Sequence, residues 1–376
     1  MFISSVKKRA DYKKYQILRE AIMDLDLTVR LFTDVKGQSG HFPKIGLGTA
    51  NLKEKTAEAV SNALRNGYNL LDAALLYGNQ EEVGKGIKMS GIPRNQFQVT
   101  TKVGFFPPNS EGVWMYNANN VKGNETESID LCLKQLGLDY VDLLLIHNPT
   151  TSVPEYNAAS SPHFFELLGY FDSPDAIKPE KLHGEPIRPL IVDSMLRKAK
   201  EKGHSKQEAL RIRQQSWANL EKAYKEGKAK MIGVSNYPAE LLEEMKSYAE
   251  IMPAVNQIEY HPRFASQKTY EKCKELGIVI QSYGILHASL IGYEKIDTTL
   301  KSISSQGGRS EIQTAIRWAA QKNVCAILRS SSKDNQGSNL ASLTGPDLSR
   351  EDIDSIDSLD ENHPYYWLPE ASIQTI

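Results

Sequence analysis

Short apolar runs alternate with helix-like patterns along most of this chain. Eight runs have the length and composition of buried strands, and they lie at 45–48, 69–71, 98–103, 141–146, 230–234, 254–258, 278–282 and 324–328. Between them, apolar residues recur every three or four positions, as on the buried face of an amphipathic helix. Strands that alternate with helices form parallel sheets, and eight such repeats favour a closed (β/α)8 barrel, the TIM barrel, over an open sheet.

Patterns before the first barrel strand predict two additions to the barrel. Residues 28–32 and a turn at 37–40 predict a small N-terminal hairpin. Residues 11–25 carry apolar and aromatic positions at helical spacing. We therefore expect residues 1–27 to form an N-terminal helical extension, and residues 28–376 to form a single barrel domain.

Helix boundaries are also marked in the sequence. A helix predicted over 56–66 ends before Gly67, a residue type that adopts the left-handed conformation common just after a helix. Ser205 and Glu208 form a capping-box pattern, and a helix that starts there should stop at Gly227. A solvated helix is expected within the charged stretch 347–360, with three buried apolar positions: Ile353, Ile356 and Leu359.

One connection is too long for an ordinary βα loop. The strand ends at His147 and Ser235 are 88 positions apart (235 − 147), and prolines crowd the first part of the segment. Prolines at this density oppose a regular helix, so we expect an insertion at about 151–205 after the fourth barrel strand. Because it leaves the strand that carries His147, it should lie at the mouth of the site. Its aromatic residues favour an ordered lid or pocket wall, and decoration of the solvent side is the alternative.

Composition narrows the class of protein. The formal net charge is −1 and the pI is near 6.7, so the chain lacks the basic character that favours nucleic acid or an anionic membrane surface. The three cysteines are far apart and without a CxxC pair, which indicates reduced thiols. The sequence has neither an apolar run of about 20 residues nor a secretory signal pattern. We therefore expect a cytoplasmic protein that binds neither membranes nor nucleic acid, with a transit peptide as the less favoured alternative.

Three successive predicted strands end on ionisable residues. Asp72 follows the strand at 69–71, Lys102 lies at the end of 98–103, and His147 follows 141–146. Tyr77 comes five residues after Asp72 at a strand-to-helix corner. The C-terminal ends of all strands meet at one rim of a (β/α)8 barrel, so these four side chains should converge there.

That set of residues suits proton donation to a carbonyl oxygen. A tyrosine has an ordinary pKa of about 10, and an adjacent ammonium favours the phenolate, so we expect Lys102 to lower the pKa of Tyr77. Asp72 would keep Lys102 charged, and His147 would hold the substrate oxygen. The set has no nucleophile, and the histidines and cysteines show no metal-ligand spacing, so another molecule must supply electrons. The alternative is a purely structural Asp72–Lys102 ion pair.

These residues lie in sequence blocks that resemble the aldo-keto reductases. The blocks occur in the family's order, each at a predicted strand end, at 72–79, 102, 145–149, 232–237, 255–262 and 329–331. The resemblance covers roughly residues 28–360. It implies a (β/α)8 barrel that binds extended NADP(H) without a glycine-rich Rossmann loop, and the sequence indeed has no GxGxxG after a strand.

The resemblance also implies roles for individual residues. Tyr77 matches the family's proton donor, Asp72 and Lys102 match the pair that tunes its pKa, and His147 matches the residue that orients the carbonyl. Asp72 would also approach the nicotinamide ribose. Further implied cofactor contacts are Ser235, Asn236 and Gln257 with the carboxamide, Tyr283 stacked on the nicotinamide ring, Arg329 and Ser330 with the 2′-phosphate, and Asn339 with adenine.

Some positions depart from the family's pattern. The second arginine that grips the 2′-phosphate is Asn335 here, which leaves one guanidinium for that phosphate. Gly284 and Ile285 replace a Ser-Pro pair after the stacking tyrosine. Ala50 stands where many members have a pocket tryptophan, and we expect Trp114, in the aromatic loop 104–118, to rebuild part of that wall and contact substrate.

We therefore expect an NADP(H)-dependent oxidoreductase that reduces an aldehyde or ketone to an alcohol, with hydride from nicotinamide C4 and the proton from Tyr77. It should act on a small-molecule carbonyl substrate as a monomer or weak dimer. Two alternatives remain. One is an NAD-dependent alcohol dehydrogenase, favoured by Asn335, and the other is a non-catalytic regulatory subunit that keeps the barrel and the cofactor. We expect His261 to be structural, without an evident partner.

Overall fold

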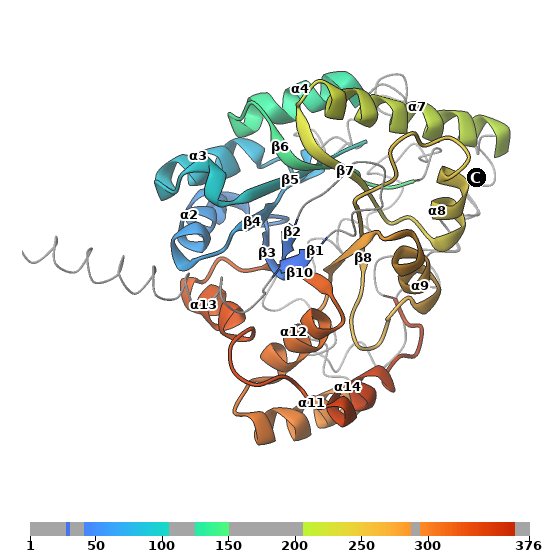
Figure 1. Cartoon of the computed structure of the whole chain (residues 1–376). Coiled ribbons are helices and arrows are strands. Elements are labelled where there is room, and N and C mark those ends of the chain that lie inside the picture. Colours follow the sequence, from blue (N-terminus) through green and yellow to red (C-terminus); the bar gives the residue numbers. More distant parts are fainter. Residues whose placement is uncertain (1–27, 31–40, 105–124, 150–205, 287–293, 365–376) are drawn as a thin grey trace, which may run out of the picture.

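Eight parallel strands form a closed barrel in the computed structural model (Figure 1). The structure describes residues 28–30, 41–104, 125–149, 206–286 and 294–364. Around the barrel, each strand pairs with the next in the chain, and β10 closes the ring by pairing with β3. The strands are β3 (Ile45–Gly48), β4 (Leu70–Asp72), β5 (Gln98–Val103), β6 (Val141–Ile146), β7 (Ala229–Ser235), β8 (Val255–Glu259), β9 (Val279–Tyr283) and β10 (Val324–Arg329). The predicted (β/α)8 barrel is confirmed, with observed strand ends within one residue of the predicted ones.

Helices surround this ring (Figure 1). They are α2 (Thr56–Asn66), α3 (Gln80–Ser90), α4 (Glu125–Leu136), α7 (Lys206–Lys225), α8 (Ala239–Met245), α9 (Gln267–Leu276), α11 (Glu294–Gly307), α12 (Glu311–Gln321), α13 (Lys333–Ala341) and α14 (Arg350–Asp357). Within the described residues, three short 3-10 helices lie in loops: η1 (Lys53–Lys55), η2 (Leu75–Tyr77) and η3 (Arg94–Gln96). As predicted, α2 ends at Asn66 and Gly67 follows in the left-handed conformation, with φ of 105°.

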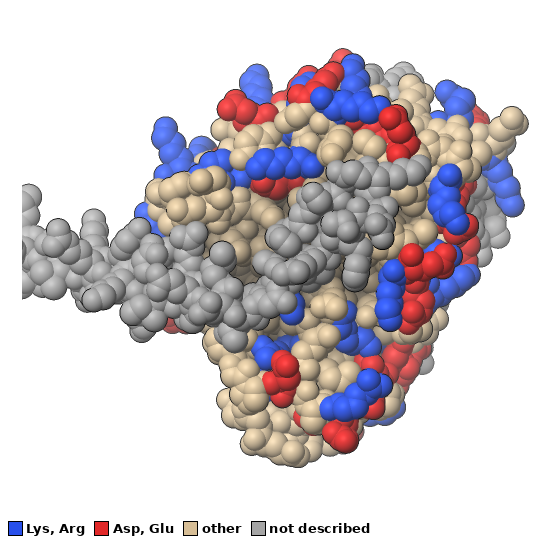
Figure 2. Space-filling view, in the orientation of Figure 1, with Lys and Arg blue, Asp and Glu red and all other residues tan. Residues whose placement is uncertain are grey.

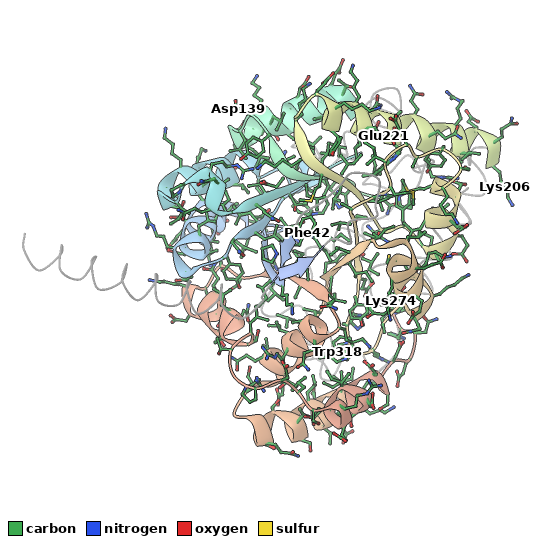
Figure 3. The ribbon with its side chains drawn as sticks, viewed as in Figure 1. Phe42, Asp139, Lys206, Glu221, Lys274 and Trp318 are labelled. Atoms are coloured by element: carbon green, nitrogen blue, oxygen red, sulfur yellow. The ribbon has the colours of Figure 1, made fainter. Side chains whose placement is uncertain are left out.

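The predicted N-terminal hairpin is also confirmed. Strands β1 (Thr28–Arg30) and β2 (His41–Pro43) pair antiparallel, just before the first barrel strand. Phe42 is fully buried and packs in a cluster with residues of β6 to β9, including Leu143 and Val255. In Figure 3, Phe42 lies in the middle of the molecule, within the ring of strands. Since β2 runs directly into β3, the hairpin covers the N-terminal end of the barrel and leaves the opposite end for a site.

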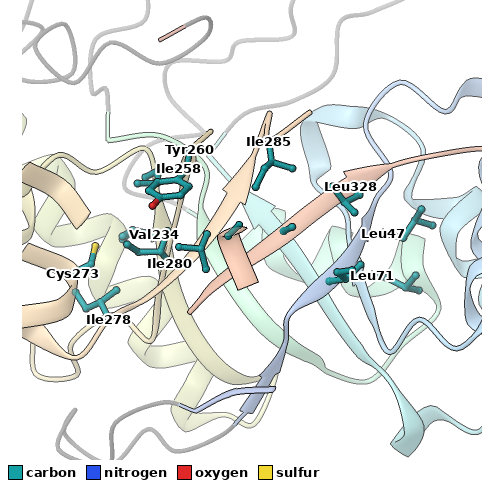
Figure 4. Packing of buried hydrophobic residues seen from close by; sticks show 14 of the residues in the cluster. Leu47, Leu71, Val234, Ile258, Tyr260, Cys273, Ile278, Ile280, Ile285 and Leu328 are labelled. Atoms are coloured by element: carbon teal, nitrogen blue, oxygen red, sulfur yellow. The ribbon is translucent and has the colours of Figure 1, made fainter. Parts of the chain in front are cut away.

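The alternation of side chains along each strand separates the outer core from the barrel interior. Leu328, Leu47 and Leu71 are register partners on three neighbouring strands, and all three are buried in the main apolar cluster (Figure 4). Gly48 and Asp72, one residue further on, are register partners as well and line the interior cavity. Because side chains alternate between the two faces of a strand, the leucines face the helices while Asp72 faces inward.

Close helix packing fixes the segment after Tyr77. A Cβ atom added to Gly86 of α3 would lie 2.6 Å from the Ala57 carbonyl oxygen of α2, and one added to Gly84 would lie 2.5 Å from the Leu136 carbonyl oxygen. Both distances are shorter than real Cβ contacts, so only glycine allows α3 to approach its neighbours this closely. This packing holds the N-terminus of α3 beside the barrel rim.

Aromatic stacking holds α12 against the residue that follows β8. Trp318 of α12, labelled in Figure 3, is fully buried and stacks on Tyr260 with ring centroids 5.1 Å apart. Its indole nitrogen donates a hydrogen bond to Asp357 of α14. Three apolar positions in and just after α14 were predicted to be buried. Ile356 and Leu359 are buried, and Ile353 is partly buried.

The distribution of charged residues and cysteines agrees with the near-zero net charge and the expectation of reduced thiols. Figure 2 shows basic and acidic side chains interspersed over the visible face. Within the described ranges, no helix is long and apolar enough to cross a membrane. All three cysteines, Cys132, Cys273 and Cys325, are free and buried. The predicted N-terminal extension, the insertion at about 151–205 and the loop with Trp114 lie outside the described residues.

Candidate active site

The ends of β4 and β5 and the short helix η2 bring three of the predicted residues into direct contact. Lys102 Nζ lies 2.6 Å from Asp72 Oδ1 and 3.1 Å from the Tyr77 hydroxyl oxygen. Its third hydrogen bond, of 3.1 Å, goes to the Ala73 carbonyl oxygen. The three donors of the ammonium are therefore all engaged, and the Lys102 side chain is fully buried. The predicted convergence of Asp72, Tyr77 and Lys102 is present.

Burial and charge act in opposite directions on this group. Burial raises the pKa of Tyr77, and the Lys102 ammonium lowers it by charge and by its hydrogen bond; the net pKa is above the ordinary value. Our expectation of a lowered pKa for Tyr77 is therefore wrong, because loss of solvation outweighs the attraction of Lys102. For Lys102, burial lowers the pKa, but Asp72 and Tyr77 raise it, so the net pKa is raised and the ammonium stays charged. At neutral pH the site thus holds a protonated phenol beside a cation.

His147 faces the same phenol from the end of β6. The rings of Tyr77 and His147 meet edge to face, with centroids 5.8 Å apart and an angle of 85° between their planes. The backbone places His147 there through a hydrogen bond from its amide to the Val103 carbonyl oxygen, 2.9 Å long. Asn236 Nδ2 donates to the His147 carbonyl oxygen at 3.0 Å. All four residues of the predicted catalytic group therefore meet at one rim of the barrel.

Gln257 extends this network across the barrel. Its Nε2 donates to Asp72 Oδ2 at 2.7 Å and to Gln281 Oε1 at 3.0 Å, and both glutamines are register partners on β8 and β9. Since both N–H groups of the amide are engaged, the Gln257 oxygen is its remaining hydrogen-bonding group, and Gln257 lines the cavity. Gln281 is a contact that sequence reasoning missed. Its position two residues before Tyr283, on the same face of the strand, is the signal that would have indicated it.

A second polar group continues along the rim. Ser235 Oγ donates to the Gln257 carbonyl oxygen at 2.7 Å, and the Tyr283 hydroxyl donates to Asn236 Oδ1 at 2.6 Å. Asn236 adopts the left-handed conformation, with φ of 63°, which turns the chain sharply after β7. The half-buried Tyr283 ring thus lies beside the predicted carboxamide contacts.

Two neighbouring cavities lie at this end of the barrel. The first, of about 400 Å³, has a lining that includes Ala50, Asn51, Asp72, Tyr77, His147, Ser235, Asn236, Gln257, Tyr283, Ile285 and Arg329. The second, of about 480 Å³, is lined by Asn51, Leu52, Lys53, Glu54, Lys55, Arg329, Ser330, Ser331, Ser332 and Asn335. Because Asn51 and Arg329 line both, the two cavities adjoin, and together they make up a groove that reaches from Tyr77 to the start of α13. The sequence reasoning did not identify Asn51, Lys53 or Lys55, although they directly follow the strand end at Gly48.

The structure places the remaining predicted residues, Arg329, Ser330, Asn339 and His261, in or near these cavities or in the protein core. Arg329 and Ser330 line the second cavity. Asn339 is buried in α13 beside the Tyr68 hydroxyl and lines neither cavity. His261 is buried, as a structural residue would be, but the expectation that it has no evident partner is wrong. Its Nε2 lies 3.1 Å from Glu259 Oε1, and both side chains are fully buried.

Comparison with known proteins assigns the family. The sequence model of the Aldo/keto reductase family matches residues 44–361. This chain belongs to the aldo/keto reductase family. It is 30% identical to a glyoxal reductase of Bacillus subtilis, over 89% of this chain and 93% of the relative. It is 31% identical to an NAD(P)H-dependent D-xylose reductase of Candida tropicalis, over 89% and 95% of the two chains.

A solved structure gives the same assignment. An aldo-keto reductase from a deep-sea metagenome library of the Medee basin superposes with a TM-score of 0.64 at 27% identity, covering 87% of this chain and 95% of that one. As an aldo-keto reductase, this protein is an NAD(P)H-dependent oxidoreductase that carries out carbonyl reduction. This assignment favours an enzyme over the alternative of a non-catalytic regulatory subunit.

Proposed function

We propose that this aldo-keto reductase uses NADPH to reduce an aldehyde or ketone to an alcohol, with Tyr77 as the proton donor. The observation that carries the proposal is the Tyr77 hydroxyl 3.1 Å from a fully buried Lys102 ammonium, at the wall of a cavity of about 400 Å³. A protonated phenol can give a proton to a carbonyl oxygen, and the adjacent cation stabilises the phenolate that remains.

The residues lining the groove fit a nicotinamide dinucleotide. The free oxygen of the Gln257 amide and the polar groups of Ser235 and Asn236 suit a carboxamide, which carries both donors and an acceptor. The Tyr283 ring offers a flat surface beside them. Where the two cavities adjoin, Arg329 supplies a guanidinium for a phosphate.

The protein's own residues then act as follows. A reduced nicotinamide, when bound in this cavity, supplies a hydride to the carbonyl carbon. Tyr77 transfers its proton to the carbonyl oxygen, and the Lys102 ammonium donates its hydrogen bond to the phenolate oxygen. Asp72 keeps the lysine charged and aimed, and His147 positions the carbonyl oxygen near the phenol. Solvent later returns the proton to Tyr77.

NADP(H) is favoured over NAD(H) because the groove ends among cations. Arg329, Lys53 and Lys55 line its outer part, against a single carboxylate, Glu54. Asn335 in the same cavity supports the alternative, an NAD-dependent alcohol dehydrogenase, since an amide does not offset the charge of a 2′-phosphate. The ratio of NADPH to NADH affinity distinguishes the two.

A turnover screen tests the proposal. The panel contains aldehydes, ketones and sugars, including glyoxal, D-xylose and D-galacturonate because reductases named for these compounds are among the relatives. Oxidation of NADPH and NADH is followed by absorbance with each compound. We expect carbonyl-dependent oxidation of NADPH. A preparation saturated with either dinucleotide that reduces no member of the panel would contradict the proposal.

A further inference from the structure

The turn between β3 and α2 places two lysines in the same cavity as Arg329. Lys53 and Lys55 are exposed and line the second cavity, to which residues 329–332 and Asn335 also contribute. The lining carries three cationic side chains and one anionic side chain, Glu54. Such an excess of positive charge in a concave site favours an anion.

The turn has an unusual backbone. Asn51 and Lys53 both adopt the left-handed conformation, with φ of 56° and 50°. Side chains other than glycine adopt this conformation at an energetic cost, and such residues are concentrated at ligand sites. Asn51 lines both cavities, so the strained turn lies at the point where they join.

Buried hydrogen bonds hold the turn in place. Asn79, which follows Tyr77 by two residues, donates to the Thr49 carbonyl oxygen at 2.8 Å and to Thr56 Oγ1 at 3.1 Å. Thr56 Oγ1 in turn donates to the Lys53 carbonyl oxygen at 2.7 Å. The turn that carries both lysines is thereby fixed relative to the corner that carries Tyr77.

Residues 329–332, which also line the second cavity, are held to α2. The buried amide of Gln336 donates to the Ser330 carbonyl oxygen and to the Ala59 carbonyl oxygen of α2, each at 3.0 Å. Ser332 caps α13, which directs the N-terminus of that helix towards the cavity wall. Helix N-termini carry partial positive charge, which adds to that of the side chains. Both segments that line the second cavity are therefore preorganised by hydrogen bonds to the barrel or to α2.

We propose that Lys53 and Lys55 bind the 2′-phosphate of NADP(H) together with Arg329 and so replace the charge that Asn335 does not provide. This inference rests on the proposed function, since it assigns the phosphate end of the groove whose other end holds Tyr77. A phosphate bound in the second cavity would be attracted by the two lysine ammonium groups and by the guanidinium, because all three residues line it. The chain would thus prefer NADP(H) by a different set of residues from that expected of the family.

Binding measurements test this without relying on turnover. Dissociation constants are measured by calorimetry for NADPH, NADH, adenosine 2′,5′-bisphosphate and 5′-AMP with the wild-type protein, the Lys53→Ala/Lys55→Ala variant and the control Lys88→Ala. Lys88 is an exposed lysine of α3 that lines neither cavity. We expect the double variant to bind NADPH and adenosine 2′,5′-bisphosphate at least about tenfold more weakly, on the scale of lost hydrogen bonds to a charged group. NADH, 5′-AMP and the control should change less than about twofold on the same scale.

Three outcomes would overturn the inference while leaving NAD(P)H-dependent reduction intact. They are an unchanged NADPH affinity in the double variant, an equal loss for NADPH and NADH, and a wild-type protein that binds both dinucleotides equally well. The second would place the lysines at the pyrophosphate. A wild-type protein that binds neither dinucleotide would instead refute the proposed function. Thermal unfolding of the double variant, measured in the absence of ligand, separates a binding effect from misfolding.

Discussion

The ammonium of Lys102 lies 2.6 Å from the carboxylate of Asp72, and both side chains are almost completely buried. A buried ion pair is expensive to desolvate, so it adds little stability over an apolar pair, but removal of one partner leaves an uncompensated charge. Here the pair has further partners, since Asp72 accepts a hydrogen bond from Gln257 and Lys102 donates to Tyr77. The pair therefore links Tyr77 on one side of the rim to Gln257 of β8 across the barrel.

This geometry predicts the effect of Lys102→Met. The substitution keeps the volume of the side chain but leaves the Asp72 carboxylate buried without its cation, which should destabilise the protein by about 3–5 kcal/mol. Adding Asp72→Asn to Lys102→Met should restore much of that loss, because the remaining charge is removed as well. Urea denaturation of the three proteins measures both effects. A single variant as stable as the wild type would show that the pair is not needed for folding.

The pKa directions predict how the site responds to base. Burial raises the pKa of Tyr77 above its ordinary 10.0, and Asp72 helps to raise that of Lys102 above 10.5 despite burial. Both shifts favour the protonated forms in the folded protein. Their contribution to stability is therefore fully present below about pH 10 and is lost as the pH rises through the folded-state values.

A titration of the phenol measures the pKa of Tyr77 in the folded protein directly. Tyrosinate absorbance of the wild type minus that of Tyr77→Phe isolates the ionisation of residue 77 in the protein without cofactor. We expect an apparent pKa above 10. Ionisation below pH 9 would mean that the attraction of Lys102 outweighs burial after all.

Arg329→Ala should separate the two dinucleotides. Arg329 lines both cavities and is assigned to the 2′-phosphate, so its loss should weaken NADPH binding about tenfold or more, as for a charge-assisted hydrogen bond, and leave NADH binding nearly unchanged. Fluorescence titration with both dinucleotides gives the ratio of the NADPH and NADH dissociation constants for the variant and the wild type. An equal loss for both would place Arg329 at a part of the cofactor that the two share.

The packing of α3 predicts a stability effect away from the chemistry. Gly86→Ala adds a Cβ atom 2.6 Å from the Ala57 carbonyl oxygen and 2.7 Å from the Val60 Cβ, so α2 and α3 must move apart. Overpacking of this kind typically costs about 1–3 kcal/mol. Gly337→Ala in α13 is the matched control, because the space around that position is open. Thermal unfolding midpoints compare the two, and equal midpoints would show that the helices adjust freely.

Much of the fold and the meeting of the four site residues followed from the sequence. The ends of the apolar runs located Asp72, Lys102 and His147 at strand ends, and the geometry of a parallel barrel brings strand ends to one rim. The contact between Gln257 and Asp72 joins residues 185 positions apart across the barrel, and no local pattern indicates it.

Other features depend on three-dimensional packing. The sign of the pKa shift of Tyr77 is set by the desolvation of the phenol, which cannot be obtained from the identity of its neighbours alone. The contact between His261 and Glu259 also depends on the fold, because β8 ends at Glu259 and His261 lies beyond it, where no strand alternation fixes the direction of its side chain. The placement of Lys53 and Lys55 depends on a turn in which Lys53 is left-handed, a conformation that lysine does not favour.

The central claim is that the Tyr77 phenol gives its proton to the substrate. Single-turnover reduction by Tyr77→Phe, saturated with NADPH and a carbonyl substrate found in the screen, tests it most directly. Loss of a general acid should slow the hydride step by about 10²-fold or more. The NADPH dissociation constant should stay within about twofold of the wild type, less than the effect of one hydrogen bond to a charged group. A variant that binds NADPH normally and reduces the substrate at the wild-type rate would contradict the account.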